Sequence, residues 1–273
     1  MIVHASQKMD ISFYIEWLHT RLQEGFFDKD INEKTIHRIL LKDISELVLY
    51  CKNPTKIYRN RDLFEKYNPK LITAYTAYDL LYEPKVKDKE KILKAINKCH
   101  KAFRNYVLYG PIFLTEIHSL EWHKNQFKWL CEQTPETDGY YISFDINQGC
   151  QKSKRFGCVP LDATARSIIL DDLRNVADDF NRKVEMLPSE ETFDIDEIDV
   201  GLNNCCPNAC EYCKYITAKS AAINKYKTFN QRSTMLYGIK SAKQNVVEID
   251  LNKQKDDSNQ SEPMSLLEML AME

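Results

Sequence analysis

Glycine is scarce in this chain, with only seven residues among 273. Loops that cradle phosphate groups, such as the P-loop and the dinucleotide-binding turn, depend on closely spaced glycines, and neither pattern occurs here. The nucleophile elbow of the α/β-hydrolases is absent as well. The sequence therefore argues against nucleotide enzymes and hydrolases of those classes.

Long apolar runs and an excess of one charge are also missing. No stretch reaches about 18 apolar residues, so we expect no membrane-spanning helix and no membrane partner. Residues 1–6 lack a charged lead and a long apolar segment, and do not resemble a signal peptide. The formal net charge is −2, which provides no overall positive field to attract nucleic acid.

Cysteine is present in an odd number, nine residues. A disulfide framework suits a short secreted chain with an even number of cysteines, and this chain is neither short nor even. A reducing, cytoplasmic environment with mostly free thiols and one metal site is the better interpretation. Hydrophobic residues make up 43% of the chain, which is enough for a large folded core.

Seven short apolar runs alternate with helical patterns along the chain. Runs of about five residues bounded by turn residues are typical of strands buried on both faces. Their alternation with helices predicts parallel β/α units, and thus an α/β fold with a partial or complete (β/α) barrel. In such barrels the chemistry lies in loops after the C-terminal ends of the strands. The expected strands are Ile2–Ser6, Leu47–Cys51, Leu71–Tyr75, Tyr106–Tyr109, Tyr140–Phe144, Lys183–Leu187 and Ile198–Leu202.

Three segments between these runs have helical periodicity, namely residues 11–23, 88–100 and 160–180. Asp10 is suited to cap the first helix and Gly25 to end it. We therefore expect residues 1–240 to form one barrel-type domain.

Residues 241–273 are predicted to form a flexible polar tail with a short apolar end, because residues 252–261 are entirely polar. The apolar stretch Met264–Leu270 has two interpretations. It is either a frayed end that packs on the chain's own surface or a docking peptide for a protein partner on a flexible tether.

Three closely spaced cysteines carry the clearest functional signal. Cys206, Cys210 and Cys213 follow a strand-like run with the spacing C-x3-C-x2-C. Thiolates are the ligands that iron–sulfur clusters require, and three of them leave one iron of a [4Fe–4S] cluster open. The alternative is zinc, which needs a fourth ligand, from Cys205 or from Cys150 and Cys158 further away.

This spacing, with Tyr212 just before the last cysteine, resembles the signature of radical S-adenosylmethionine (SAM) enzymes. In ordinary members the motif lies near the start of the barrel, whereas here it lies near the end. That placement resembles an uncharacterised prokaryotic family known only as a domain of unknown function, with a C-terminal cysteine cluster. Lys52-Asn53-Pro54 after the second strand, Asp199-Val200-Gly201 before the cysteines, and the opening turn at residues 6–12 are similar to segments of that family.

The resemblance implies a cyclically shifted radical SAM barrel with a [4Fe–4S] cluster on the three cysteines. SAM would chelate the open iron, and the reduced cluster would cleave it to a 5′-deoxyadenosyl radical. In such a barrel the first strand lies beside the strand that leads into the cluster. Ser6, Lys8 and Asp10 on its exit loop are therefore the candidates to contact SAM, although Asp10 equally suits a helix cap.

Two departures from the family pattern leave the function open. Leu108 and Gly110 stand where the family has an arginine and an aspartate, and Glu190-Glu191-Thr192 replaces a pair of cysteines. These changes imply a different substrate, or lost catalysis. The sequence thus supports two hypotheses: a radical SAM-type enzyme with an unknown substrate, or a non-catalytic adaptor stabilised by an iron–sulfur cluster or zinc.

Other polar residues give weaker signals. His118 and His123 are five residues apart, which does not place them on one helix face, and we expect them at the surface or in an interface rather than as metal ligands. Asp145 and Asn147 follow a predicted strand and are as well explained by loop solvation. Lysines interleaved with Tyr215 and Tyr226 at residues 214–227 suit nucleic acid, but exposed helical lysines are commoner, so nucleic acid is an unlikely partner.

Overall fold

The computed structural model describes residues 1–5, 7–32, 35–78, 82–83, 85–144, 157, 161–188, 192–208, 210–216, 218–236 and 245–251, with residues 30–32 and 245 as backbone alone. Within these ranges, no helix is both long and apolar enough to cross a membrane.

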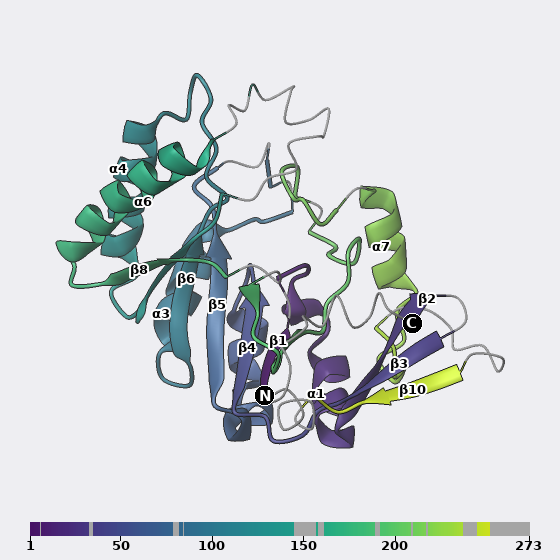
Figure 1. The fold of residues 1–273 in the computed structure, drawn as a ribbon. Helices are drawn as coiled ribbons and strands as arrows, with labels where there is room; N and C mark the ends of the chain where they lie inside the picture. The colour runs from purple at the N-terminus through teal and green to yellow at the C-terminus, as the bar shows by residue number, and fades with distance from the viewer. Residues whose placement is uncertain are drawn as a thin grey trace, which may run out of the picture.

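A seven-stranded, all-parallel sheet forms the centre of the molecule and curls into a half-barrel (Figure 1). Its order is β8-β7-β6-β5-β4-β1-β9. All seven predicted strands are confirmed, and the barrel is partial because β8 and β9 form its two edges. The strands are β1 (Ile2–Ala5), β4 (Glu46–Cys51), β5 (Pro69–Tyr75), β6 (Arg104–Tyr109), β7 (Gly139–Ile142), β8 (Lys183–Met186) and β9 (Glu197–Asp199).

The last strand of this sheet lies beside the first. β9 pairs in parallel with β1, so that Ile2 is opposite Glu197 and His4 is opposite Asp199. The expected neighbourhood of the first strand and the strand that leads into the cysteines is thus confirmed. The exit loops of β1 and β9 consequently leave the same edge of the sheet together.

Side-chain caps explain where several helices begin. Asp162 Oδ1 accepts a hydrogen bond of 2.7 Å from the backbone N–H of Ala165, so the helix predicted at 160–180 begins at Ala163. The helix predicted at 11–23 is interrupted at Tyr14, and Gly25 ends it in the left-handed conformation. The helical segments are η1 (Ile11–Phe13), α1 (Ile15–Glu24), α2 (Thr55–Arg59), η2 (Arg61–Leu63), η3 (Glu65–Tyr67), α3 (Lys89–Cys99), α4 (Leu120–Gln133), α6 (Ala163–Asp178) and α7 (Lys219–Lys227).

A second, three-stranded sheet was not predicted. It consists of β2 (Phe26–Asn32), β3 (Thr35–Leu40) and β10 (Asn245–Ile249), in the order β10-β3-β2. Because β10 pairs along its whole length with β3, the prediction of a flexible tail from residue 241 is wrong for residues 245–249. Residues 252–273, with the apolar stretch 264–270, lie outside the described residues.

The two largest hydrophobic clusters of the described residues pack around the main sheet. One joins β1, β4, α1 and the small sheet to the cysteine segment, and includes the fully buried Trp17 and Cys205. The other lies under α3, α4 and α6, and α4 and α6 pack side by side next to β8 (Figure 1). The expectation of surface histidines is wrong, because His118 and His123 are 8% and 1% exposed and lie among buried aromatic rings.

Candidate metal centre

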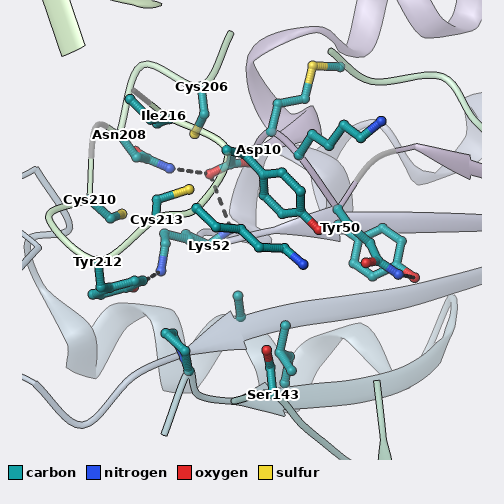
Figure 2. A pocket seen from close by; sticks show the side chains of 18 of the residues that line it. Asp10, Tyr50, Lys52, Ser143, Cys206, Asn208, Cys210, Tyr212, Cys213 and Ile216 are labelled. Carbon is teal, nitrogen blue, oxygen red and sulfur yellow. Dashed lines mark hydrogen bonds between the residues drawn. The ribbon is translucent and has the colours of Figure 1, made fainter. Parts of the chain in front are cut away.

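A pocket opens at the C-terminal ends of the parallel strands, where the barrel-type fold predicted the chemistry. About 850 Å³ there is free of protein atoms, part of it open to solvent. Its wall comes from the exit loop of β1, the ends of β4 to β8, and the segment that follows β9 (Figure 2). Residues separated by most of the chain therefore face one space.

The three predicted cysteines all line this pocket. Cys206 and Cys210 are buried, Cys213 is partly exposed, and their sulfurs lie on the inner side of one loop (Figure 2). We call residues 204–216 the cysteine loop. Cys205, by contrast, packs in the hydrophobic core and its thiol donates to the Asn203 carbonyl at 3.2 Å. The structure thus separates the three candidate ligands from their neighbour.

Burial dominates the titration of these thiols. It raises the pKa of Cys210 to about 11, against the nearby Lys52 ammonium, which lowers it. Burial also raises the pKa values of Cys206 and Cys213. Without a compensating positive charge the thiols therefore favour their neutral form, as buried thiols do.

The donor set fits a thiolate-bound cluster in number and kind, but the side chains are not arranged around one centre. In the described part of the chain, no three or more His, Cys, Asp or Glu side chains are placed as ligands of one metal ion. A cluster shared by the three thiols therefore requires their sulfurs to move toward a common point. No disulfide restrains them from doing so.

Contacts from several elements hold the cysteine loop in place. The Asn204 N–H donates to the Tyr215 carbonyl at 2.8 Å and closes the base of the loop. The buried Tyr14 hydroxyl donates to the Cys205 carbonyl at 2.5 Å, and Lys85 Nζ donates to the Pro207 carbonyl at 3.0 Å. The backbone of the loop is therefore fixed relative to the sheet edge.

Asp10 joins three loops at the wall of the pocket. Its Oδ1 accepts the Ser12 N–H at 3.0 Å and caps η1. Its Oδ2 accepts the Asn208 side-chain N–H at 2.8 Å and the Lys52 backbone N–H at 3.1 Å (Figure 2). Asp10 is therefore both the predicted cap and the point that connects the cysteine loop to the ends of β1 and β4.

Lys52 and Glu83 form a buried ionic network that sequence analysis did not identify. Lys52 Nζ forms an ion pair with Glu83 Oε1 and donates to the Tyr212 hydroxyl at 2.8 Å, while that hydroxyl donates to the same carboxylate. Thr76 and Lys89, the latter at 3.4 Å, contact the other carboxylate oxygen.

The charge state of this network follows from its contacts. Burial acts to raise the pKa of Glu83, but Lys52 and Lys89 together hold it below its ordinary value. Burial likewise opposes the charge on Lys52, but Cys210 and Glu83 raise its pKa. A lysine directly after a strand of a β/α fold is the signal that identifies Lys52, whereas no sequence pattern indicates Glu83.

The structure describes only some of the remaining predicted site residues. Lys8 lines the pocket beside Asp10, so two of the three SAM candidates face the cysteine loop. The third, Ser6, lies outside the described residues, as do Asp145, Asn147, Cys150 and Cys158. The zinc alternative with ligands from Cys150 and Cys158 therefore stays a prediction.

Comparison with known proteins places the chain in a family. No curated protein and no solved structure matches it. The family described as "Domain of unknown function (DUF1848)" matches residues 2–198. The match covers the main sheet almost to the end of β9 and stops before the cysteine loop, so it does not bear on the cysteines. The chain belongs to the DUF1848 family.

Proposed function

We propose that this protein binds a [4Fe–4S] cluster through Cys206, Cys210 and Cys213 and acts as a radical SAM-type enzyme on a substrate held in the adjoining pocket. The observation that carries the proposal is the convergence of the three thiols on one pocket at the C-terminal edge of a parallel half-barrel. The ligand number and type suit a cluster with one open iron.

The spatial order of the strands supports the same proposal. Counted from its edge, the sheet runs β9, β1, β4, β5, β6, β7 and β8. The cysteine loop thus follows the strand that is first in space although it is last in sequence. This is the arrangement expected of a radical SAM-like half-barrel whose sequence is cyclically shifted.

Two lysines of the chain have different roles in this proposal. The cluster with bound SAM supplies the radical chemistry, and the protein contributes position, charge and exclusion of water. Lys52 places a positive charge near thiolates that burial alone disfavours. Lys8 faces the pocket from the loop beside the cysteine loop, where it can contact the carboxylate of SAM.

The pocket residues at the end of β6 suggest that the substrate carries no strong charge on the side that faces them. Leu108 and Gly110, at the end of β6, both line the pocket. These are the positions at which the resembled pattern has an arginine and an aspartate. Here a leucine and a glycine stand in place of two charged residues. This difference favours a substrate different from that of relatives with the charged pair.

Anaerobic purification followed by iron, sulfide and zinc analysis tests the cluster. We expect about four irons per chain, lost in each of Cys206→Ala, Cys210→Ala and Cys213→Ala. Cys205→Ala is the matched control, since its thiol lies in the core, and should keep its iron. Zinc without sulfide, or full iron content in all three variants, would contradict the assignment.

Electron paramagnetic resonance of the reduced protein tests SAM binding separately. The cluster signal should change on addition of SAM, and Lys8→Ala should weaken that response while iron content is unchanged. A cluster signal that does not change on addition of SAM would indicate an iron–sulfur protein without SAM chemistry. The adaptor hypothesis then becomes the better one, and removal of residues 252–273, which leaves β10 in place, should abolish partner binding.

A further inference from the structure

A second cleft adjoins the cysteine pocket and has a different character. The two share the side chains of Asp10, Lys52 and Asn208 in their common wall. From there the second cleft extends past α2 toward the segment that precedes α3. We call it the basic cleft, after Lys56, Arg59, Lys85 and Lys87, which line it in addition to Lys52.

The balance of charge in the basic cleft is strongly positive. Among the described lining residues, five side chains are cationic and Asp10 is the one carboxylate. Asp10 is occupied by its three hydrogen-bond donors, and Lys52 is paired with Glu83. Among the described residues, no carboxylate forms an ion pair with Lys56, Arg59, Lys85 or Lys87. A concentration of unpaired cations on a chain of net charge −2 attracts anions to this place.

Two aromatic rings complete the wall of the basic cleft. Phe13 from η1 and Tyr226 from α7 both line it, and their ring centroids are 5.2 Å apart in an edge-to-face arrangement. Both side chains are partly exposed. Partly exposed rings beside cations are suited to stack a planar group while the cations hold phosphate oxygens.

We propose that the basic cleft binds the phosphate of a nucleotide-type ligand, with Lys56, Arg59 and Lys87 on the phosphate and Phe13 and Tyr226 on its planar ring. The phosphate is held by side chains, which agrees with the scarcity of glycine-rich loops in the sequence. Because the cleft shares a wall with the cysteine pocket, a ligand bound there lies next to that pocket. The inference goes beyond the proposed function and does not require the cluster.

Equilibrium binding of 5′-AMP, adenosine and a single-stranded oligonucleotide to the full chain tests this proposal. We expect 5′-AMP to bind at least about tenfold more tightly than adenosine, and its affinity to fall as NaCl rises from about 50 to about 300 mM. The triple variant Lys56→Ala, Arg59→Ala, Lys87→Ala should lose about tenfold or more. All three side chains are exposed, so the variant should fold.

A variant of equal charge controls for non-specific attraction. Lys98→Ala, Lys128→Ala, Lys183→Ala removes three exposed lysines that line neither cleft, and should bind 5′-AMP like the unmodified protein. A different outcome is that the oligonucleotide binds more tightly than 5′-AMP, with a salt dependence that is weaker in the Lys56, Arg59, Lys87 variant and unchanged in the control variant. That result would identify the phosphate as that of a nucleic acid strand. Equal binding of adenosine and 5′-AMP, equal losses in both variants, or no binding would overturn the proposal. Iron content, measured on the same samples, shows separately whether the cluster assignment holds.

Discussion

The side-chain amide of Asn208 donates a hydrogen bond of 2.8 Å to Oδ2 of Asp10, and 198 positions in the sequence separate the two residues. Both are buried. The bond connects the exit loop of the first strand of the main sheet to the cysteine loop after the last. The geometry of the candidate metal centre therefore depends on a contact between two loops that leave neighbouring strands of the sheet but come from distant parts of the sequence.

Asn208→Ala should destabilise the fold by about 2 kcal/mol, because it removes a hydrogen bond to a buried carboxylate. Asp10→Ala should cost more, since it leaves three donors without an acceptor. In a double-mutant cycle monitored by urea unfolding, we expect a coupling energy of about 1 kcal/mol. Asn53→Ala, which removes an exposed bond to the Thr55 N–H, is the matched control and should have little effect. Strictly additive effects of the Asp10 and Asn208 variants would refute the link.

Lys52→Met should destabilise the protein by about 3 kcal/mol, because it removes the nearest positive charge from the buried Glu83. Lys52→Met, Glu83→Gln together should cost clearly less than the sum of the single variants, since no uncompensated carboxylate remains. Lys94→Ala breaks an exposed ion pair with Glu90 and should change stability little. Denaturant unfolding measures all four. If the double variant loses as much free energy of unfolding as the two single variants together, the two side chains act independently.

Stability should fall in mild acid through His123. Its Nε2 lies 3.1 Å from the Phe113 carbonyl and its Nδ1 lies 3.0 Å from the Tyr109 hydroxyl, contacts that suit a neutral ring protonated on Nε2. Burial lowers its pKa from 6.5 to about 4. The unfolded chain therefore binds the extra proton first, and about 3 kcal/mol of stability is lost as the pH falls from 6.5 to 4.

Urea unfolding of His123→Asn at several pH values measures this contribution. The variant should be less stable near neutral pH but should lose less stability on acidification than the unmodified protein. His100→Asn, a substitution at the exposed C-terminal end of α3, is the control for the general effect of replacing a histidine. Identical profiles for the His123 variant and the parent would show that other groups dominate.

Gly110→Ala should disturb both stability and the pocket. A Cβ at this position would lie 2.5 Å from the Ser143 carbonyl oxygen, and the backbone has a φ of +140°. We expect a loss above about 2 kcal/mol, because backbone cannot move away as a flexible side chain can. Gly25→Ala, at a helix end with φ +76° and its nearest neighbour 4.0 Å away, should cost only about 1 kcal/mol. If the two variants show the same decrease in thermal unfolding temperature, the steric argument is contradicted.

The sequence predicts the main sheet well because each of its strands is a short apolar run buried on both faces, such as Glu46–Cys51. It does not predict the small sheet, where β2 begins with two phenylalanines and continues with charged residues. Asp28 in β2 is buried, and Arg38 in β3 pairs with it at 2.9 Å. Such a pairing becomes visible only when the two strands are side by side.

The candidate site was predictable where a local spacing carried the chemistry, and not where tertiary contacts create it. The spacing of Cys206, Cys210 and Cys213 identifies the loop, and the strand order predicts that Asp10 faces it. The network of Glu83 with Lys52 and Tyr212 spans three separate segments. No periodicity or motif marks a lone glutamate that becomes functional by burial.

The pairing of β9 with β1 has a consequence for the order of events during protein synthesis. The other six strands of the main sheet lie between Ile2 and Met186, and the N-terminal part of a chain leaves the ribosome first. Those strands can complete their pairing before the edge that carries the cysteines has left the ribosome. The thiols can thus join a surface that is already assembled, and the proposed cluster would then be bound by a largely folded sheet and not by a nascent chain.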